Sequence, residues 1–217
     1  IPCLPSFPFV HIVRMLAFAS MMMLSSSALS RSGSSLISAV RRPLSSRAGV
    51  RAVIKEGDKL PDVTLFEGQP EYAKANEIPL GELVAGKTAV IFAVPGAFTP
   101  GCSKSHLPSF IDKYDELLAS GVDVIACTAT NDPYVMEAWG RASGVKDGTI
   151  KMLSDKNAEL CRALGVASES DVMVRSERYA MVVKDGIVSS FLPALQADGS
   201  KVSEVTYAPS VLSALTG

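Results

Sequence analysis

The sequence predicts an α/β fold in which helices flank a central mixed sheet. Two mainly apolar runs, residues 88–94 and 122–128, are typical of strands that are buried on both faces. Each run is followed by a turn and then by apolar residues at helical spacing. Further along the chain, two apolar segments on either side of Asp185-Gly186 have the pattern of a β-hairpin. Strands and helices therefore alternate before the chain closes with a hairpin and a helix.

The first part of the chain differs from the rest in composition. Residues 1–55 hold seven Lys and Arg and no Asp or Glu, whereas residues 56–217 hold 14 Lys and Arg against 22 Asp and Glu. A Ser-rich, Arg-bearing and acid-free segment is typical of an organellar transit peptide. We expect a disordered leader over residues 1–53, directed to mitochondria, with plastid or cytosol as alternatives. A single domain is expected over residues 54–217.

Other interpretations of the leader fit less well. Residues 16–29 resemble the apolar part of a secretory signal, but no basic residue directly follows Met15, the expected start of translation. Serines interrupt the apolar run well short of the ~20 residues that a membrane span needs. The acidic balance of residues 56–217 gives no indication of nucleic-acid binding.

The elements of the domain follow from periodicity and from residues that end helices and strands. A turn and a short strand are expected within residues 57–66, and a short connection over 76–86. The first long helix follows Cys102; Pro108 is expected to kink it, and Gly121 ends it. Asn131-Asp132 before Pro133 is a helix-capping combination, which predicts a helix through residue 139.

The second half of the domain is predicted in the same way. We expect a strand over 150–153, a helix over 157–164 that Gly165 ends, strands over 179–184 and 187–191, and a closing helix over 209–215. This order of strands and helices predicts a thioredoxin-like fold.

Cys102 is the principal candidate for chemistry. It stands where the core strand over residues 88–94 ends and a helix begins. Free N–H groups and the positive end of the helix dipole at such a position favour thiolate over thiol. Because free cysteine has a pKa of roughly 8.5, this placement raises its reactivity. A cysteine in this position can also be simply a small buried apolar residue.

The residues around Cys102 favour the chemical interpretation. Pro95 stiffens the exit from the strand and shields the sulfur, and the Thr99 hydroxyl is close enough in sequence to hydrogen-bond a thiolate or a bound oxygen. The spacing Pro95-x3-Thr99-x2-Cys102 resembles the peroxiredoxin signature, and residues 94–108 resemble the peroxiredoxin-5, or type II (atypical), subfamily in particular. The resemblance extends from about residue 54 to the end of the chain.

This resemblance implies a thiol-dependent peroxidase that reduces hydrogen peroxide and alkyl hydroperoxides without metal, haem or flavin. It implies that Cys102 is the peroxidatic cysteine, that Thr99, Gly101 and Cys102 line the substrate site, and that Arg178 is the active-site arginine. Arg175 is the second choice for that arginine. Electrons would come from thioredoxin, or from glutaredoxin and glutathione, and a homodimer is the suggested assembly.

The cysteine that would resolve the oxidised Cys102 stays open at this stage. Cys127, on the next strand, resembles the second cysteine of plant type II forms. The animal forms carry their resolving cysteine in the loop before the last helix, where this chain has Val205. Cys161 is a weaker candidate, and a one-cysteine mechanism with an external thiol is the third possibility.

Several other functions are disfavoured by the sequence. A disulfide oxidoreductase would need a second cysteine at position 105, which is serine. Cys102-x3-His106 has no second ligand pair for zinc, so His106 is expected to be structural. No phosphate-binding loop or dinucleotide fingerprint is present. The remaining alternative is a peroxide sensor or holdase that uses the same cysteine with low turnover.

Overall fold

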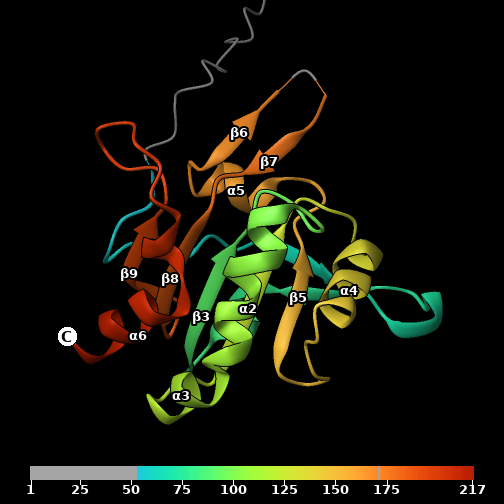
Figure 1. Ribbon diagram of the computed structural model, residues 1–217, viewed down its shortest axis with the longest axis horizontal. Helices are drawn as coiled ribbons and strands as arrows, with labels where there is room; N and C mark the ends of the chain where they lie inside the picture. The colour runs from blue at the N-terminus through green and yellow to red at the C-terminus, as the bar shows by residue number, and fades with distance from the viewer. Residues whose placement is uncertain (1–52, 171) are drawn as a thin grey trace, which may run out of the picture. The chain divides into compact units, whose positions relative to one another are not determined.

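The computed structural model describes residues 53–170 and 172–217. The expected leader over residues 1–53 lies outside the described residues apart from Val53. A seven-stranded sheet forms the centre of the described part, with strand order β2-β1-β5-β4-β3-β8-β9 (Figure 1). The strands of this sheet are β1 (Thr64–Glu67), β2 (Asn76–Pro79), β3 (Thr88–Ala93), β4 (Val124–Ala129), β5 (Ile150–Ser154), β8 (Tyr179–Lys184) and β9 (Ile187–Pro193). Two short strands, β6 (Ala167–Glu169) and β7 (Val174–Ser176), form a separate antiparallel pair.

The helices connect these strands. The α-helices are α1 (Leu80–Val84), α2 (Leu107–Asp112), α3 (Tyr114–Ala119), α4 (Pro133–Ala142), α5 (Glu159–Ala163) and α6 (Ala208–Thr216). Shorter helical segments are the 3₁₀ turns η1 (Pro70–Tyr72) and η3 (Ser203–Thr206) and the π-helical segment η2 (Cys102–His106).

The sheet is mixed, as the sequence predicts. Strands β3, β4 and β5 run parallel, with Phe92 opposite Cys127 and Cys127 opposite Met152. On the other side of β3, β8 is antiparallel and places Tyr179 opposite Ala93. This last pairing brings the residue before Tyr179 to the end of β3, where the chain turns toward Cys102.

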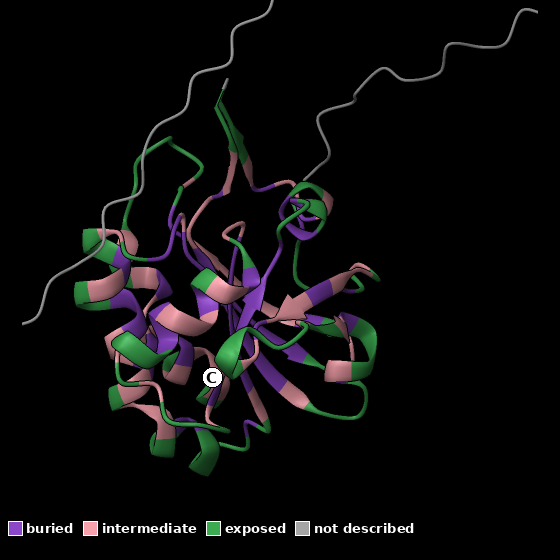
Figure 2. Cartoon of the chain, turned by 90° about the vertical axis from the view of Figure 1, so that its right-hand side faces the viewer, coloured by how far each residue is buried: buried purple, intermediate pink, exposed green. Residues whose placement is uncertain are grey.

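Buried side chains form one core on each face of the sheet, because neighbouring residues of a strand point to opposite faces. In Figure 2 the colour for buried residues runs through the strands of the central sheet. Helices α2, α3, α4 and α6 cover one face, where Phe92, Phe110 and Trp139 pack together. Helices α1 and α5 cover the other face, where Leu80 and Leu160 pack against the strands.

Most elements lie where the sequence predicts them. The β8–β9 hairpin turns at Asp185 (φ 48°) and Gly186 (φ 78°), the pair of positive φ values that a two-residue hairpin turn requires. The Asp132 side chain caps α4 by accepting a hydrogen bond from the Tyr134 N–H at 2.9 Å. The expected connection over residues 76–86 contains strand β2 and helix α1.

The helix after Cys102 differs from the prediction. It begins as the π-helical η2, and Pro108 starts the following α-helix instead of kinking it. Proline is well tolerated there because its missing N–H would have no partner in the first turn of a helix. The break comes later, at Lys113 (φ −103°, ψ 12°), which separates α2 from α3.

The β6–β7 hairpin is another part of the fold that the sequence prediction missed, besides β2 and α1. Each of its strands has three residues, and most of these are exposed or half-buried. Such short strands carry too little alternation of polar and apolar residues to be detected. Their tip projects from the rest of the domain in Figure 1, and Val172 and Met173 expose their side chains there.

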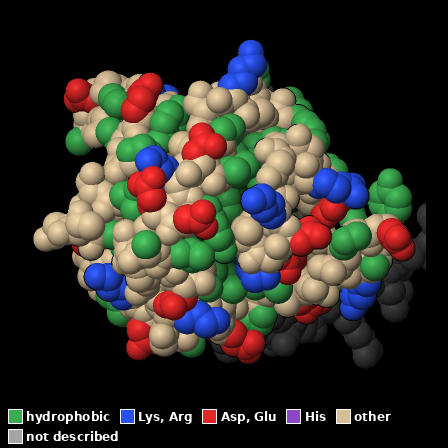
Figure 3. Space-filling view, turned by 60° about the horizontal axis from the view of Figure 1, so that its bottom comes forward, with side chains coloured by type: hydrophobic (Ala, Val, Ile, Leu, Met, Phe, Trp, Pro, Cys, Tyr) green, Lys and Arg blue, Asp and Glu red, His purple; other side chains and the backbone are tan. Residues whose placement is uncertain are grey.

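The described surface is mixed in charge. On the face shown in Figure 3, acidic and basic side chains alternate over short distances. Within the described residues, none of the helices has the length and apolar character needed to cross a membrane.

Candidate active site

Cys102 opens the π-helical segment that follows β3. Its side chain is 1% exposed and belongs to the core on the α2 face of the sheet. The turn from strand to helix contains Phe98 in the left-handed region (φ 57°), and this residue is 59% exposed. A π-helical segment is a rare feature that often accompanies functional sites. The sulfur thus lies at the carboxyl end of the central strand, held between sheet and helix.

Arg178 lies beside this sulfur. Its Nη2 is 3.2 Å from the Cys102 Sγ, although 76 residues separate the two in sequence. The antiparallel pairing of β8 with β3 explains this approach, since it places residue 178 just past the end of β3. Gly101 borders the guanidinium: a Cβ atom there would lie 3.5 Å from Arg178 Nη2, an ordinary van der Waals contact. A permanent positive charge at this distance stabilises a thiolate.

His106 holds Arg178 in place. Its Nδ1 accepts a hydrogen bond from Arg178 Nη1 at 2.6 Å, and its Nε2 lies 3.0 Å from the Thr206 carbonyl oxygen. An arginine only donates and a carbonyl only accepts, so the imidazole is neutral with its proton on Nε2. Burial and the nearby Arg178 lower the pKa of His106 to about 3. The imidazole therefore links the C-terminal segment to the arginine beside Cys102.

The expectation that His106 is structural is incomplete for this reason. The residue is fully buried, but one of its ring nitrogens contacts Arg178, which itself contacts the sulfur. The sequence offered one signal for this role. His106 follows Cys102 by four residues, and residues four apart share one face of a helix, so the spacing could have predicted that His106 lies near the sulfur.

The Thr99 hydroxyl, expected to bond a thiolate or a bound oxygen, lies in the same turn and has no hydrogen bond to the Cys102 sulfur. It donates to the Gly96 carbonyl oxygen at 2.8 Å. Since that bond uses the hydroxyl proton, the oxygen can still accept a hydrogen bond from a protonated ligand. The Thr99 carbonyl also accepts from the Ser103 N–H at 2.9 Å, which ties the turn to the start of the helix.

The backbone at Pro95 and Ala97 is anchored by residues from outside the turn. Arg175 Nη1 donates to the Pro95 carbonyl oxygen at 2.8 Å, and Asn131 Oδ1 accepts from the Ala97 N–H at 2.9 Å. A side chain at Gly96 would collide with the Arg175 guanidinium. Arg175, the second choice for the active-site arginine, thus contacts the backbone of the turn, whereas Arg178 contacts the sulfur.

Cys127 lies on the same face of the sheet as Cys102. Both side chains belong to the core under α2, and Cys127 stands on β4 directly beside Phe92 of β3. Its side chain is fully buried. Burial and the neighbouring Cys102 raise the pKa of the Cys127 thiol well above its usual value. It is a protonated thiol close to the candidate nucleophile.

Cys161 lies on the opposite face. It packs in the core under α1 and α5, and its backbone N–H donates to Asp155 Oδ2 at 3.0 Å. Burial and the Asp155 carboxylate raise the pKa of its thiol to about 12. The sheet therefore separates Cys161 from Cys102.

Among the residues that the structure describes, no cluster of three or more His, Cys, Asp and Glu side chains is arranged to hold a metal ion. The arrangement can instead support thiol chemistry. A nucleophilic sulfur, a cation that stabilises its charge, and a nearby hydroxyl all converge at the carboxyl end of β3. Fold and site together define a thiol-dependent redox protein of thioredoxin-like architecture.

Comparison with known proteins identifies the family. The Redoxin family model matches residues 55–205. Over 144 residues, 64% of this chain, the sequence is 51% identical to peroxiredoxin-2E-2, chloroplastic, of Oryza sativa subsp. japonica. Over 146 residues, again 64% of this chain, it is 46% identical to peroxiredoxin-2E, chloroplastic, of Arabidopsis thaliana. The chain spans 64% and 61% of the lengths of these two relatives.

A solved structure agrees with this result. Reduced Prx3 of Vibrio vulnificus in complex with hydrogen peroxide superposes with a TM-score of 0.67 and is 41% identical. The superposition covers 75% of this chain and 99% of that one. The chain belongs to the redoxin family and, within it, to the peroxiredoxins. The type II subfamily fits, and the expected thioredoxin-like fold is confirmed.

Proposed function

We propose that this protein is a thiol-dependent peroxidase with Cys102 as the peroxidatic residue. The observation that carries the proposal is the 3.2 Å contact between Arg178 Nη2 and the Cys102 sulfur. A similar structure holds hydrogen peroxide, which supports peroxides as the substrate class. Hydrogen peroxide and alkyl hydroperoxides are the proposed substrates, and Thr99 and Gly101 complete their binding site.

The reaction follows from the groups in the site. The Cys102 thiolate attacks one peroxide oxygen, so that an S–O bond forms while the O–O bond breaks. The sulfur becomes a sulfenic acid, and the departing oxygen leaves as water or an alcohol after it takes a proton. Arg178 can donate to the charge that develops on the oxygens. The peroxide is thereby reduced by two electrons, which the sulfur supplies.

Recycling needs a resolving thiol and two further thiols from the reductant. The resolving thiol attacks the sulfenic acid to give a disulfide and water. One reductant thiol then attacks that disulfide to give a mixed disulfide, and the second releases the protein thiol and leaves the reductant oxidised to its own disulfide. We propose Cys127 for the first step, because it shares a core with Cys102 whereas Cys161 lies across the sheet. Thioredoxin, or glutaredoxin with glutathione, is the proposed electron donor. A homodimer remains a prediction.

The destination proposed for the leader, residues 1–53, differs from the one expected from composition. The names of the two chloroplastic relatives support delivery to the plastid, the alternative destination, and give no support to mitochondria. We therefore propose that residues 1–53 direct the protein to plastids.

The test of the central assignment is Cys102→Ser. This nearly isosteric change should abolish peroxide consumption, measured with thioredoxin and with glutaredoxin plus glutathione as alternative reductants. Cys161→Ser is the matched control and should keep full activity, with circular dichroism showing that both variants fold. Substantial turnover by Cys102→Ser would refute the assignment. A native protein that peroxide oxidises once but that does not turn over with either reductant would instead be a sensor.

A further inference from the structure

A cavity of about 450 Å³ lies beside the Cys102 site without including it. Its walls come from three separate segments: residues 130–132 after β4, residues 156–158 after β5, and residues 173–175 of the β6–β7 hairpin. Arg162 of α5 completes the lining. Its size falls within the range of pockets that hold small molecules.

The topology of the sheet explains why a cavity forms here. Strands β4 and β5 are parallel neighbours, so their carboxyl ends lie at one edge of the sheet. After β4 the chain crosses to the face that α4 covers, whereas after β5 it crosses to the opposite face, which α5 covers. Two adjacent parallel strands whose connections leave in opposite directions open a crevice between them. In open α/β sheets such switch points are where ligands bind.

The charge of the lining selects the class of ligand. Lys156, Arg162 and Arg175 carry positive charge, against one carboxylate, Asp132. Of these three cations, only Arg162 has a carboxylate partner among the described residues, Glu169 at 3.0 Å. Lys156 Nζ instead lies 3.7 Å from the centroid of the Phe66 ring.

Asp132 does little to offset this charge, because it caps α4 through the Tyr134 N–H. Two of the three cations, Lys156 and Arg175, thus have no carboxylate partner among the described residues. Such cations around a concave site favour oxyanions, and guanidinium groups bind carboxylate and phosphate through paired hydrogen bonds.

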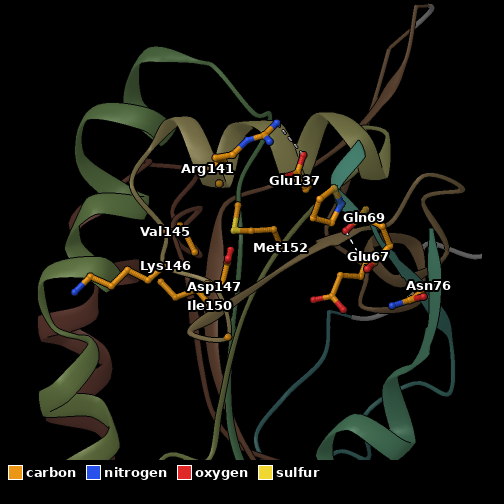
Figure 4. Close-up of a pocket in the computed structure, with 14 residues that line it drawn as sticks. Glu67, Gln69, Asn76, Glu137, Arg141, Val145, Lys146, Asp147, Ile150 and Met152 are labelled. Carbon is orange, nitrogen blue, oxygen red and sulfur yellow. Dashed lines mark hydrogen bonds and ion pairs between the residues drawn. The ribbon is translucent and has the colours of Figure 1, made fainter. Parts of the chain in front are cut away.

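A second cavity differs in the charge of the residues that line it. The cavity of about 300 Å³ between α4, β5 and the β1–β2 connection is lined by three carboxylates and two cations (Figure 4). There Arg141 pairs with Glu137 at 3.4 Å, so its charge is already compensated. The cavity at the carboxyl ends of β4 and β5 thus differs by its net positive lining as well as by its position.

Two residues that line the cavity also hydrogen-bond the backbone of the turn that carries Cys102. Arg175 and Asn131 both line it, and they hold the Pro95 carbonyl and the Ala97 N–H respectively. An oxyanion in the cavity would compete with the Pro95 carbonyl for the Arg175 guanidinium. A ligand bound in the cavity would therefore weaken a hydrogen bond that holds the backbone before Cys102 in position.

We propose that this cavity is an anion-binding site for a small molecule that bears carboxylate or phosphate groups, and that its occupancy alters the reactivity of Cys102. The proposal concerns binding and does not require that Cys102 turn over peroxide. Two sources of the oxyanion are distinguishable: a phosphate compound, or a carboxylate-bearing thiol compound such as a tripeptide reductant.

Binding is tested by calorimetric titration of the full chain at low ionic strength. Pyrophosphate is the phosphate probe, and S-methylglutathione is the carboxylate probe, which cannot react because its sulfur is blocked. At least one should bind, and Lys156→Gln/Arg162→Gln should weaken that binding by about tenfold or more, since hydrogen bonds to charged groups are lost. The probe that binds more tightly identifies the source.

The matched control is Lys87→Gln/Lys184→Gln. It removes the same charge from exposed positions at the opposite end of β3 and β8, and it should bind like the native chain. In the native chain, amide NMR shifts on binding should concentrate at residues 130–132 and 156–158, a measurement that does not depend on a variant's folding. Absence of binding by both probes, equal loss in both double variants, or shifts elsewhere would each overturn the site.

The link to Cys102 has its own measurement. Saturating probe should change the rate at which iodoacetamide alkylates Cys102 by about twofold or more in the native chain, and have no such effect in Lys156→Gln/Arg162→Gln. Binding with an unchanged alkylation rate would refute the link to the turn. Because alkylation needs no peroxide, failure of this experiment is distinct from failure of the peroxidase assignment.

Discussion

At the scale of single residues, the chemistry of the site depends on one arginine that hydrogen-bonds both the Cys102 sulfur and His106. Arg178 donates from Nη2 to the Cys102 sulfur and from Nη1 to His106. The imidazole in turn is held by the carbonyl of Thr206. This chain of contacts fixes the guanidinium plane, so that the charge beside the sulfur is oriented before any substrate arrives.

The first prediction removes this charge. Arg178→Met should lower peroxidase activity by about 10²-fold or more, the scale of losing one oriented donor. The same variant should be alkylated by iodoacetamide more slowly at pH 7, because the thiolate loses its neighbouring cation. Arg141→Met is the control, since that side chain is 70% exposed on α4. Unchanged activity and alkylation in Arg178→Met would show that the arginine plays no part in the chemistry.

The second prediction concerns pH and His106. Its pKa is about 3 in the folded protein and near 6.5 in an unfolded chain. Between these values the unfolded state binds more protons, so the free energy of unfolding falls as the pH drops from 6.5 toward 3. One such proton accounts for at most ~1.4 kcal/mol per pH unit. Above pH 6.5 this contribution is fully present.

Urea unfolding at several pH values measures this effect. The difference in stability between the native chain and His106→Gln should shrink as the pH falls through the window, because carboxylates contribute equally to both proteins. The imidazole NMR signals of His106 should also stay in the neutral form down to about pH 4. A titration of this ring near pH 6.5 in the folded protein would contradict the buried neutral assignment.

At the scale of elements, the π-helical η2 separates the sulfur from the regular helix α2. It holds Cys102 at one end and His106 at the other, and both are buried. Ser103 is anchored as well, since its hydroxyl accepts a hydrogen bond from Trp139 Nε1 at 3.0 Å. The segment is thus tied to α4, to Arg178 just before β8 and to Thr206 of η3, and moving Cys102 means breaking several of these contacts.

The third prediction follows from this restraint. If Cys127 resolves Cys102, peroxide should produce an intramolecular disulfide between them. Such a bond requires Cα atoms within about 7 Å, and Cys127 is fixed in the centre of the sheet. Unless the two Cα atoms already lie within that distance, the start of the helix must unwind locally, and the oxidised protein should then be cleaved faster by protease within residues 100–108 than the reduced protein.

Peptide mapping of the peroxide-treated protein decides this point. The variant Cys127→Ser should lose the disulfide and retain a sulfenic acid at Cys102. If Cys127→Ser turns over normally with glutaredoxin and glutathione, the one-cysteine mechanism holds instead. A bridge between Cys102 and Cys161, or between two chains, would contradict both mechanisms.

At the scale of the whole molecule, the sheet divides the protein into two chemical environments. Cys102, Cys127 and the helices around them occupy one face, while Cys161 and Asp155 lie toward the other. The active-site turn and the proposed anion site share the carboxyl edge of the parallel strands, where the loops that carry side chains for chemistry meet. The composition of residues 1–53 bears on where the protein is delivered in the cell and not on the chemistry of the site.

The fourth prediction addresses that delivery. A fusion of residues 15–53 to a fluorescent protein should enter plastids, because the segment is basic, hydroxylated and acid-free. A variant with its five arginines at positions 31, 41, 42, 47 and 51 changed to glutamine is the control and should stay in the cytosol. Import into mitochondria would restore the destination expected from composition alone, and secretion would contradict both.

The sequence by itself determined the α/β class, the β8–β9 turn, the cap of α4 and the placement of Cys102 after β3. These features depend on neighbouring residues: turn residues, helix caps and apolar periodicity act over a few positions. The resemblance of residues 94–108 was equally local, and the family comparison confirmed it.

The resemblance implied that Arg178 is the active-site arginine, but only the tertiary structure decided how it and the other distant groups meet. The contact of Arg178 with Cys102 spans 76 residues and depends on the pairing of β8 with β3. The role of His106 depends on that same pairing and on a carbonyl 100 residues away. Whether Cys127 or Cys161 shares a face with Cys102 also depends on packing. Such contacts follow from sheet order and helix docking, which no short stretch of sequence specifies, because each requires segments far apart in the chain to fold together.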